Sequence, residues 1–148
     1  MEAAVKTFFS QPRFAVVGAS NDPSKYGFKA HSLPVTPINP RALSITVSGT
    51  SYATAASISA LPTPSETAIS IITPPAITAQ VLEEARENNV IAVWLQPGSF
   101  DEQVLALAKR FGAGIGGDGG DGGEGWCVLV DGEVGLDLAQ REWKAQKL

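Results

Sequence analysis

Apolar residues along this chain come in short runs, and each run ends at a glycine, a proline or a polar turn residue. The runs are too short to be helices and are rich in valine, isoleucine and aromatic side chains, which favours β-strands. Runs with so few polar positions are typical of strands that are covered on both faces. We predict strands at residues 14–17, 68–72, 90–95 and 126–130, a short strand within 34–40 between Pro34 and Pro40, and a small extra strand around 45–47.

Stretches with helical spacing lie between the predicted strands. The clearest covers residues 76–89, where apolar residues recur every three or four positions on one face. The next helix follows a sequence of capping-box form, from Ser99 to Glu102. We also expect a short surface helix at residues 1–10, one or two helical turns within 53–61, and a closing helix at 136–148.

Strands that alternate with helices predict a parallel sheet with helices on both faces. The predicted fold class is therefore α/β: one Rossmann-like, doubly wound, mainly parallel sheet in three layers, forming a single domain over residues 1–148. Pro37 lies inside a predicted strand and needs an explanation, because proline cannot donate a ladder hydrogen bond.

Residues 112–125 contain nine glycines and repeat the sequence Gly-Gly-Asp. We predict a flexible loop over 113–125, since glycine has no side chain to bury. Calcium binding is the alternative for such an acidic tract, but the known glycine-aspartate calcium motif needs several repeats with apolar positions. We therefore expect no metal site here.

In a doubly wound fold, ligands bind beyond the carboxyl ends of the strands. Turn-forming residues follow four of the predicted strands, and all four exits are expected to face one crevice. These exits are Gly18-Ala19-Ser20, Asn39-Pro40-Arg41, Thr73-Pro74-Pro75 and Gln96-Pro97-Gly98.

The first exit has the outline of a phosphate-binding loop. Gly18 begins a stretch of small residues, and a helix that starts near Tyr26 would point free N–H groups back into it. Lys25 adds a positive charge. The loop lacks the Gly-Lys-Ser/Thr of a Walker motif and the full spacing of a dinucleotide fingerprint, so an ordinary strand-to-helix turn is the alternative.

The second exit argues against NAD. A carboxylate near the end of the second strand holds the ribose hydroxyls of NAD, and residues 38–41 contain none. Arg41 suits a phosphate on the ribose instead, which leaves NADP or coenzyme A. A solvated surface charge is the alternative for Arg41.

The composition of the chain argues against several classes of partner. The net charge is −4 and no basic patch is present, which argues against nucleic acid. The longest apolar runs are far too short to cross a membrane. With one cysteine and one histidine, we expect no internal disulfide, no zinc site and a cytoplasmic location.

Four segments carry a family resemblance: residues 16–27, 34–40, 72–75 and 93–98. In order and sequence they resemble stand-alone CoA-binding domain proteins, which are similar to the nucleotide-binding domain of the succinyl-CoA synthetase α subunit. The resemblance covers about residues 13–130 and implies a Rossmann fold that binds coenzyme A or an acyl-CoA. It implies no settled reaction.

The resemblance also implies roles for the residues at the four exits. Gly18, Ala19, Ser20, Lys25, Tyr26 and Gly27 would handle the diphosphate; Asn39, Pro40 and Arg41 the adenosine phosphate; Thr73, Pro74 and Pro75 the pantetheine; and Gln96, Pro97 and Gly98 would lie beyond.

We expect no catalytic residues. His31 is the single histidine and no Tyr-x-x-x-Lys pair occurs, so a binding module is favoured over an enzyme. The alternative is an NADP-dependent oxidoreductase with other catalytic residues. The sequence leaves open the acyl group and whether the chain forms a homo-oligomer or binds a protein partner.

Overall fold

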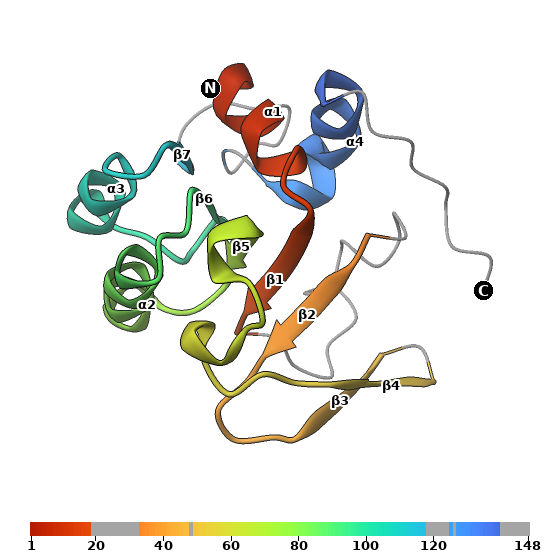
Figure 1. Ribbon diagram of the computed structural model, residues 1–148. Helices are drawn as coiled ribbons and strands as arrows, with labels where there is room; N and C mark the ends of the chain where they lie inside the picture. Colours follow the sequence, from red (N-terminus) through yellow and green to blue (C-terminus); the bar gives the residue numbers. More distant parts are fainter. Residues whose placement is uncertain (19–32, 48, 118–124, 126, 140–148) are drawn as a thin grey trace.

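The computed structural model describes residues 1–18, 33–47, 49–117, 125 and 127–139. Within these ranges the chain forms four helices, seven strands and two short 3₁₀ turns (Figure 1). The helices are α1 Glu2–Phe9, α2 Pro75–Glu87, α3 Glu102–Ala108 and α4 Val128–Leu138. The strands are β1 Arg13–Val17, β2 Val35–Ile38, β3 Ser44–Val47, β4 Thr50–Ala53, β5 Thr67–Ile71, β6 Ala92–Leu95 and β7 Ala113–Ile115, and the 3₁₀ turns are η3 Ile58–Ala60 and η4 Pro64–Glu66.

Five of the strands form one parallel sheet in the order β2-β1-β5-β6-β7. The chain passes from β1 to β2 at one edge and returns to place β5 on the other side of β1. This order is a doubly wound arrangement whose direction of winding reverses between β1 and β5. The predicted Rossmann-like fold is confirmed.

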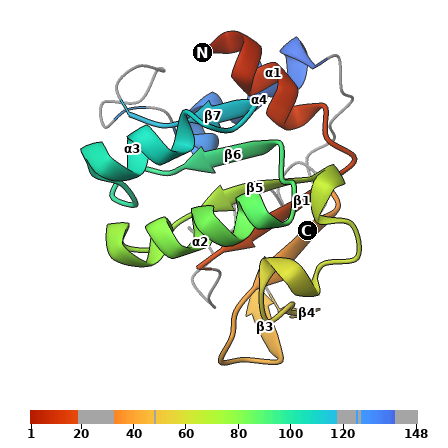
Figure 2. The same ribbon diagram turned by 60° about the vertical axis from the view of Figure 1, so that its left-hand side comes forward.

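The pleat of the sheet divides the core into two layers. Phe14 and Val16 face one side with Trp94, while Ala15 and Val17 face the other. Helices α1 and α4 cover the first face, and α2 and α3 lie side by side on the second (Figure 2). This arrangement gives the three layers that the alternation of elements predicts.

Helix α1 is not the surface helix that we expected. Val5, Phe8 and Phe9 lie on one helical face and are at most 1% exposed. The Phe8 ring meets the Trp94 ring edge to face, with the centroids 5.4 Å apart, and it lies 5.8 Å from the Phe14 ring. The helix therefore completes the aromatic core on its side of the sheet.

The predicted last strand at residues 126–130 is wrong, because the chain forms α4 from Val128 onward. Val128 and Leu136 of this helix lie in the same core cluster as Val5, Phe8 and Phe9 of α1. Close packing is possible because Gly135 has no side chain: a Cβ there would lie 2.4 Å from Phe9 Cε2. The predicted closing helix at 136–148 thus begins earlier, and residues 140–148 lie outside the described ranges.

The edge of the sheet is occupied by β7, which falls inside the tract that we predicted as a loop. Ala113 and Ile115 are buried and pair with β6. Gly114 fits between them because a Cβ at this position would lie 2.2 Å from the carbonyl oxygen of Ala108. The loop prediction for 113–125 is therefore wrong for 113–115, and residues 118–124 lie outside the described ranges.

Of two further local predictions, one is wrong and one is confirmed. Asp101, not Ser99, caps α3, because Asp101 Oδ1 accepts a hydrogen bond from Val104 N at 2.9 Å. The hydroxyl of Ser99 donates to the Gln96 carbonyl instead. The small strand predicted around 45–47 is confirmed as β3, which pairs with β4 in a hairpin.

Candidate functional site

A cavity of about 730 Å³ opens beyond the carboxyl ends of β1, β2 and β5. The arrowheads of β1 and β2 in Figure 1 point toward this end of the sheet. The volume lies within the range of about 300–1,000 Å³ that is typical of small-molecule sites. The described lining residues are Val17, Gly18, Ile38, Asn39, Pro40, Arg41, Ala56, Ser57, Ile58, Thr73, Pro74, Ile77, Val81 and Glu84.

Gly18 brings the first and third exits together at the reversal point of the sheet. Its φ is +89°, a conformation that side chains rarely adopt. A Cβ here would also lie 3.2 Å from Thr73 Cγ2 and 3.4 Å from Thr73 N. The backbone after β1 can approach the loop after β5 this closely because position 18 is glycine.

The second exit is held by a turn. Asn39 Oδ1 accepts hydrogen bonds from Arg41 N at 2.8 Å and from Ala42 N at 3.1 Å. This pattern fixes the loop through the asparagine side chain. The Arg41 side chain is exposed and borders the cavity, where an anion can reach it.

The third exit leads into α2. Thr78 is fully buried and its hydroxyl donates to the carbonyl of Thr73 at 2.9 Å. Pro74 is the N-cap residue and Pro75 occupies the first helical turn, so no side chain caps the free N–H groups that follow. The positive end of the helix dipole therefore lies beside the Thr73 loop, which favours a negatively charged ligand group.

The outer wall was missed by sequence reasoning. Residues after β4 run along β2: Asn39 N donates to the Ala55 carbonyl, and Ala55 N donates to the Pro37 carbonyl, both at 2.9 Å. The N and O atoms of a strand residue point the same way, so the Pro37 nitrogen faces this outer side and costs β1 no hydrogen bond. The pairing carries Ala56, Ser57 and Ile58 to the cavity.

The fourth exit does not line this cavity among the described residues. Gln96 is buried, and its side chain donates to Ser70 Oγ and accepts from Val128 N, both at 2.9 Å. Gly98 has a φ of +90° with nothing close to it, as in a simple turn. Pro75 is also absent from the lining. The structure thus unites three of the four predicted exits.

Five of the predicted ligand-binding residues fall in a part of the chain that the structure does not describe. Ala19, Ser20, Lys25, Tyr26 and Gly27 lie outside the described residues, as does His31. Within the described part of the chain, no group of three acidic, histidine or cysteine residues could hold a metal ion. No helix in that part is long and apolar enough to cross a membrane.

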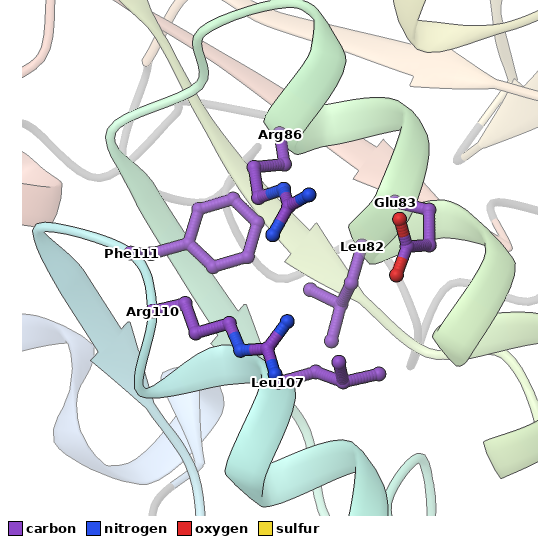
Figure 3. Close-up of a pocket in the computed structure, with 6 residues that line it drawn as sticks. All are labelled: Leu82, Glu83, Arg86, Leu107, Arg110 and Phe111. Carbon is purple, nitrogen blue, oxygen red and sulfur yellow. The ribbon is translucent and has the colours of Figure 1, made fainter.

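A second hollow lies between α2 and α3, where Arg86 and Arg110 extend toward the same space beside Phe111 (Figure 3). Its volume is about 10 Å³. That is room for about one water molecule, so this hollow is no candidate for a nucleotide.

The comparisons with known proteins agree with this geometry. A family model described as a CoA binding domain matches residues 12–120. Among curated proteins, none matches the chain.

Solved structures are also similar to it, among them the following three. A conserved hypothetical protein from Pyrococcus furiosus shares 27% identity, with a TM-score of 0.58 over 70% of this chain and 90% of the other. A protein from Thermus thermophilus shares 23% identity, with a TM-score of 0.65 over 91% and 98%. Prb, a protein redesigned for binding, shares 19% identity, with a TM-score of 0.66 over 96% and 94%. The last two likenesses concern the fold alone.

The family match spans most of the chain, and the matched segment includes every described residue that lines the cavity. The chain belongs to the CoA-binding domain family.

Proposed function

We propose that this chain binds coenzyme A or an acyl-CoA in the cavity beyond β1, β2 and β5, without catalysing a reaction of its own. The observation that carries the proposal is the position of this cavity at the reversal point of the sheet, in a chain of the CoA-binding domain family. Doubly wound proteins bind nucleotides at this point.

The charges along the cavity support a ligand with phosphates. Arg41 is the only cation among the described lining residues, and we assign it to the 3′-phosphate of the ribose. Gly18 and the loop that follows it, with Ala19, Ser20, Lys25, Tyr26 and Gly27, would bind the diphosphate. The uncapped N-terminus of α2 adds a favourable field for this group.

The pantetheine arm would leave along Thr73 and Pro74, with Pro75 behind them. The exit Gln96-Pro97-Gly98 would lie farther along the arm, although Gln96 itself is bonded to Ser70 and Val128. A binding role without catalysis is supported by the single histidine and the single cysteine of the sequence. We place this binding protein in the cytoplasm.

Calorimetry with CoA, acetyl-CoA, NADPH and NADH tests the proposal. We expect CoA or acetyl-CoA to bind at least tenfold more tightly than NADPH, and NADH to bind most weakly, because no described carboxylate follows β2 to hold a free ribose. Comparison of CoA with acetyl-CoA identifies the preferred form. Binding of NADPH as tight as that of CoA would overturn the proposal in favour of an oxidoreductase.

A further inference from the structure

One wall of the cavity combines apolar side chains with a single carboxylate. Ile77, Val81 and Glu84 are spaced by four and three residues on α2, so they lie along one face of the helix. Ile58 of η3 lines the same cavity and is 1% exposed. Ile77 is 46% exposed even though it is a large apolar residue. An apolar wall open to solvent is suited to the flat face of an aromatic base.

Glu84 is held in place by the outer wall. Ser59 N donates a hydrogen bond to Glu84 Oε1 at 3.0 Å. Ser59 belongs to η3, which follows the segment that pairs with β2 through Ala55. The carboxylate is therefore tied to the outer wall that pairs with β2, and Arg41 lies in the loop after β2.

A carboxylate is unexpected in a site for an anionic nucleotide. Among the described lining residues, Glu84 is the only acid and Arg41 the only base. A carboxylate repels phosphate, so it favours a ligand only where the ligand presents a hydrogen-bond donor. The adenine ring of a nucleotide presents one strong donor, its 6-amino group, at the edge of a flat apolar surface.

We infer that Glu84 selects an adenine base by accepting a hydrogen bond from the 6-amino group. Ser59 N engages Oε1, and Oε2 is the atom that we assign to the base. Arg41 on the 3′-phosphate and Glu84 on the base would then fix the two ends of the same nucleoside. This inference rests on the proposed function and adds a residue that determines its specificity.

The test compares CoA with the CoA analogue whose base is purine, which lacks the 6-amino group. Hydrogen bonds to charged groups predict a preference of the wild-type protein for CoA of roughly 10- to 100-fold. Glu84→Gln keeps an oxygen for Ser59 N but removes the charge and leaves one acceptor oxygen, so the preference should fall to about threefold or less.

Glu83→Gln is the matched control, because Glu83 is the neighbouring residue on α2 and lines the small hollow shown in Figure 3 instead of the cavity. It should keep the wild-type preference. Each variant is judged by a ratio of two affinities, so partial loss of folded protein cancels.

A wild-type protein that binds both compounds equally, or a Glu84→Gln variant that keeps the full preference, would overturn the assignment of Glu84 and leave CoA binding intact. Failure of the wild-type protein to bind either compound would overturn the proposed function together with this inference.

Discussion

Gly18 shows how one residue can determine the geometry of the site. Its positive φ disfavours a side chain, and separately a Cβ at 3.2 Å from Thr73 Cγ2 would require Thr73 to shift by a few tenths of an ångström. Gly49 has a φ of +79° but nothing within 4 Å of its would-be Cβ. Comparing the two glycines therefore separates the free-energy cost of the backbone conformation from the cost of contact with the Thr73 loop.

We predict that Gly18→Ala and Gly49→Ala each lower the free energy of unfolding by about 1–2 kcal/mol, the cost of a left-handed conformation. Only Gly18→Ala should also weaken CoA binding, by roughly tenfold, because the new methyl group displaces Thr73. Denaturant unfolding and calorimetry measure the two effects. Equal affinities for CoA in the two variants would show that the approach of Gly18 to Thr73 does not matter for the ligand.

At this scale the sequence predicts those site residues that follow a strand directly. Gly18, Asn39 and Thr73 could be found because each marks the point where an apolar run ends. Glu84 could not, since helical periodicity identifies it only as a polar residue of an amphipathic helix. Its place in the cavity depends on η3, which is positioned by a hydrogen bond between segments 25 residues apart.

Among the elements, the start of α4 is held to the sheet by the Gln96 side chain. Gln96 at the end of β6 bonds both Ser70 of β5 and the backbone N of Val128 at the start of α4. Gln96 is 7% exposed, so these groups would lose their partners in a nearly dry environment if it were replaced.

We predict that Gln96→Ala lowers the free energy of unfolding by about 2–4 kcal/mol, since it leaves two buried polar groups unsatisfied. CoA affinity of the folded protein should stay within about threefold, because the Gln96 side chain is bonded to Ser70 and Val128 and does not line the described part of the cavity, even though its exit lies along the proposed pantetheine arm. Gln103→Ala, an exposed position on α3, serves as the control and should change stability by less than about 0.5 kcal/mol. A large loss of CoA affinity at unchanged stability would instead place Gln96 at the ligand.

The elements that sequence reasoning misassigned were missed for two different physical reasons. An apolar run such as residues 126–130 fits a buried strand or a buried helix equally well, and tertiary packing decides between them. Here β7 is the last strand of the sheet in the described part of the chain, and the helix that begins at Val128 packs on α1 at Gly135. The strand β7 was hidden for the opposite reason, because its glycine-rich composition has low β-propensity.

In the whole molecule, the fold class could be predicted more securely than the ends of the strands. Alternating strands and helices permit few arrangements once crossovers are right-handed, and the observed order β2-β1-β5-β6-β7 is one of them. The same topology brings three of the four exits to one cavity. The hairpin β3–β4 and the segment after it add a wall to the cavity but do not change the order of the strands in the sheet.

The two cores lie on opposite faces of the same strands, so they should unfold together. CoA bound at one end of the sheet would then stabilise the whole domain. At a ligand concentration of 100 times the dissociation constant, this stabilisation is about 2.7 kcal/mol. For a chain of 148 residues, it raises the melting temperature by about 5–10 °C.

Calorimetric melting with and without CoA measures this shift, and NADH at the same concentration is the control ligand, for which we expect a much smaller rise. We predict one cooperative transition that moves as a unit, because β1, β5 and β6 each contribute side chains to both cores. Two transitions, of which CoA moves only one, would contradict this prediction. They would mean that α1 and α4 unfold separately from the layer that contains the cavity, and that the strands do not couple the two faces.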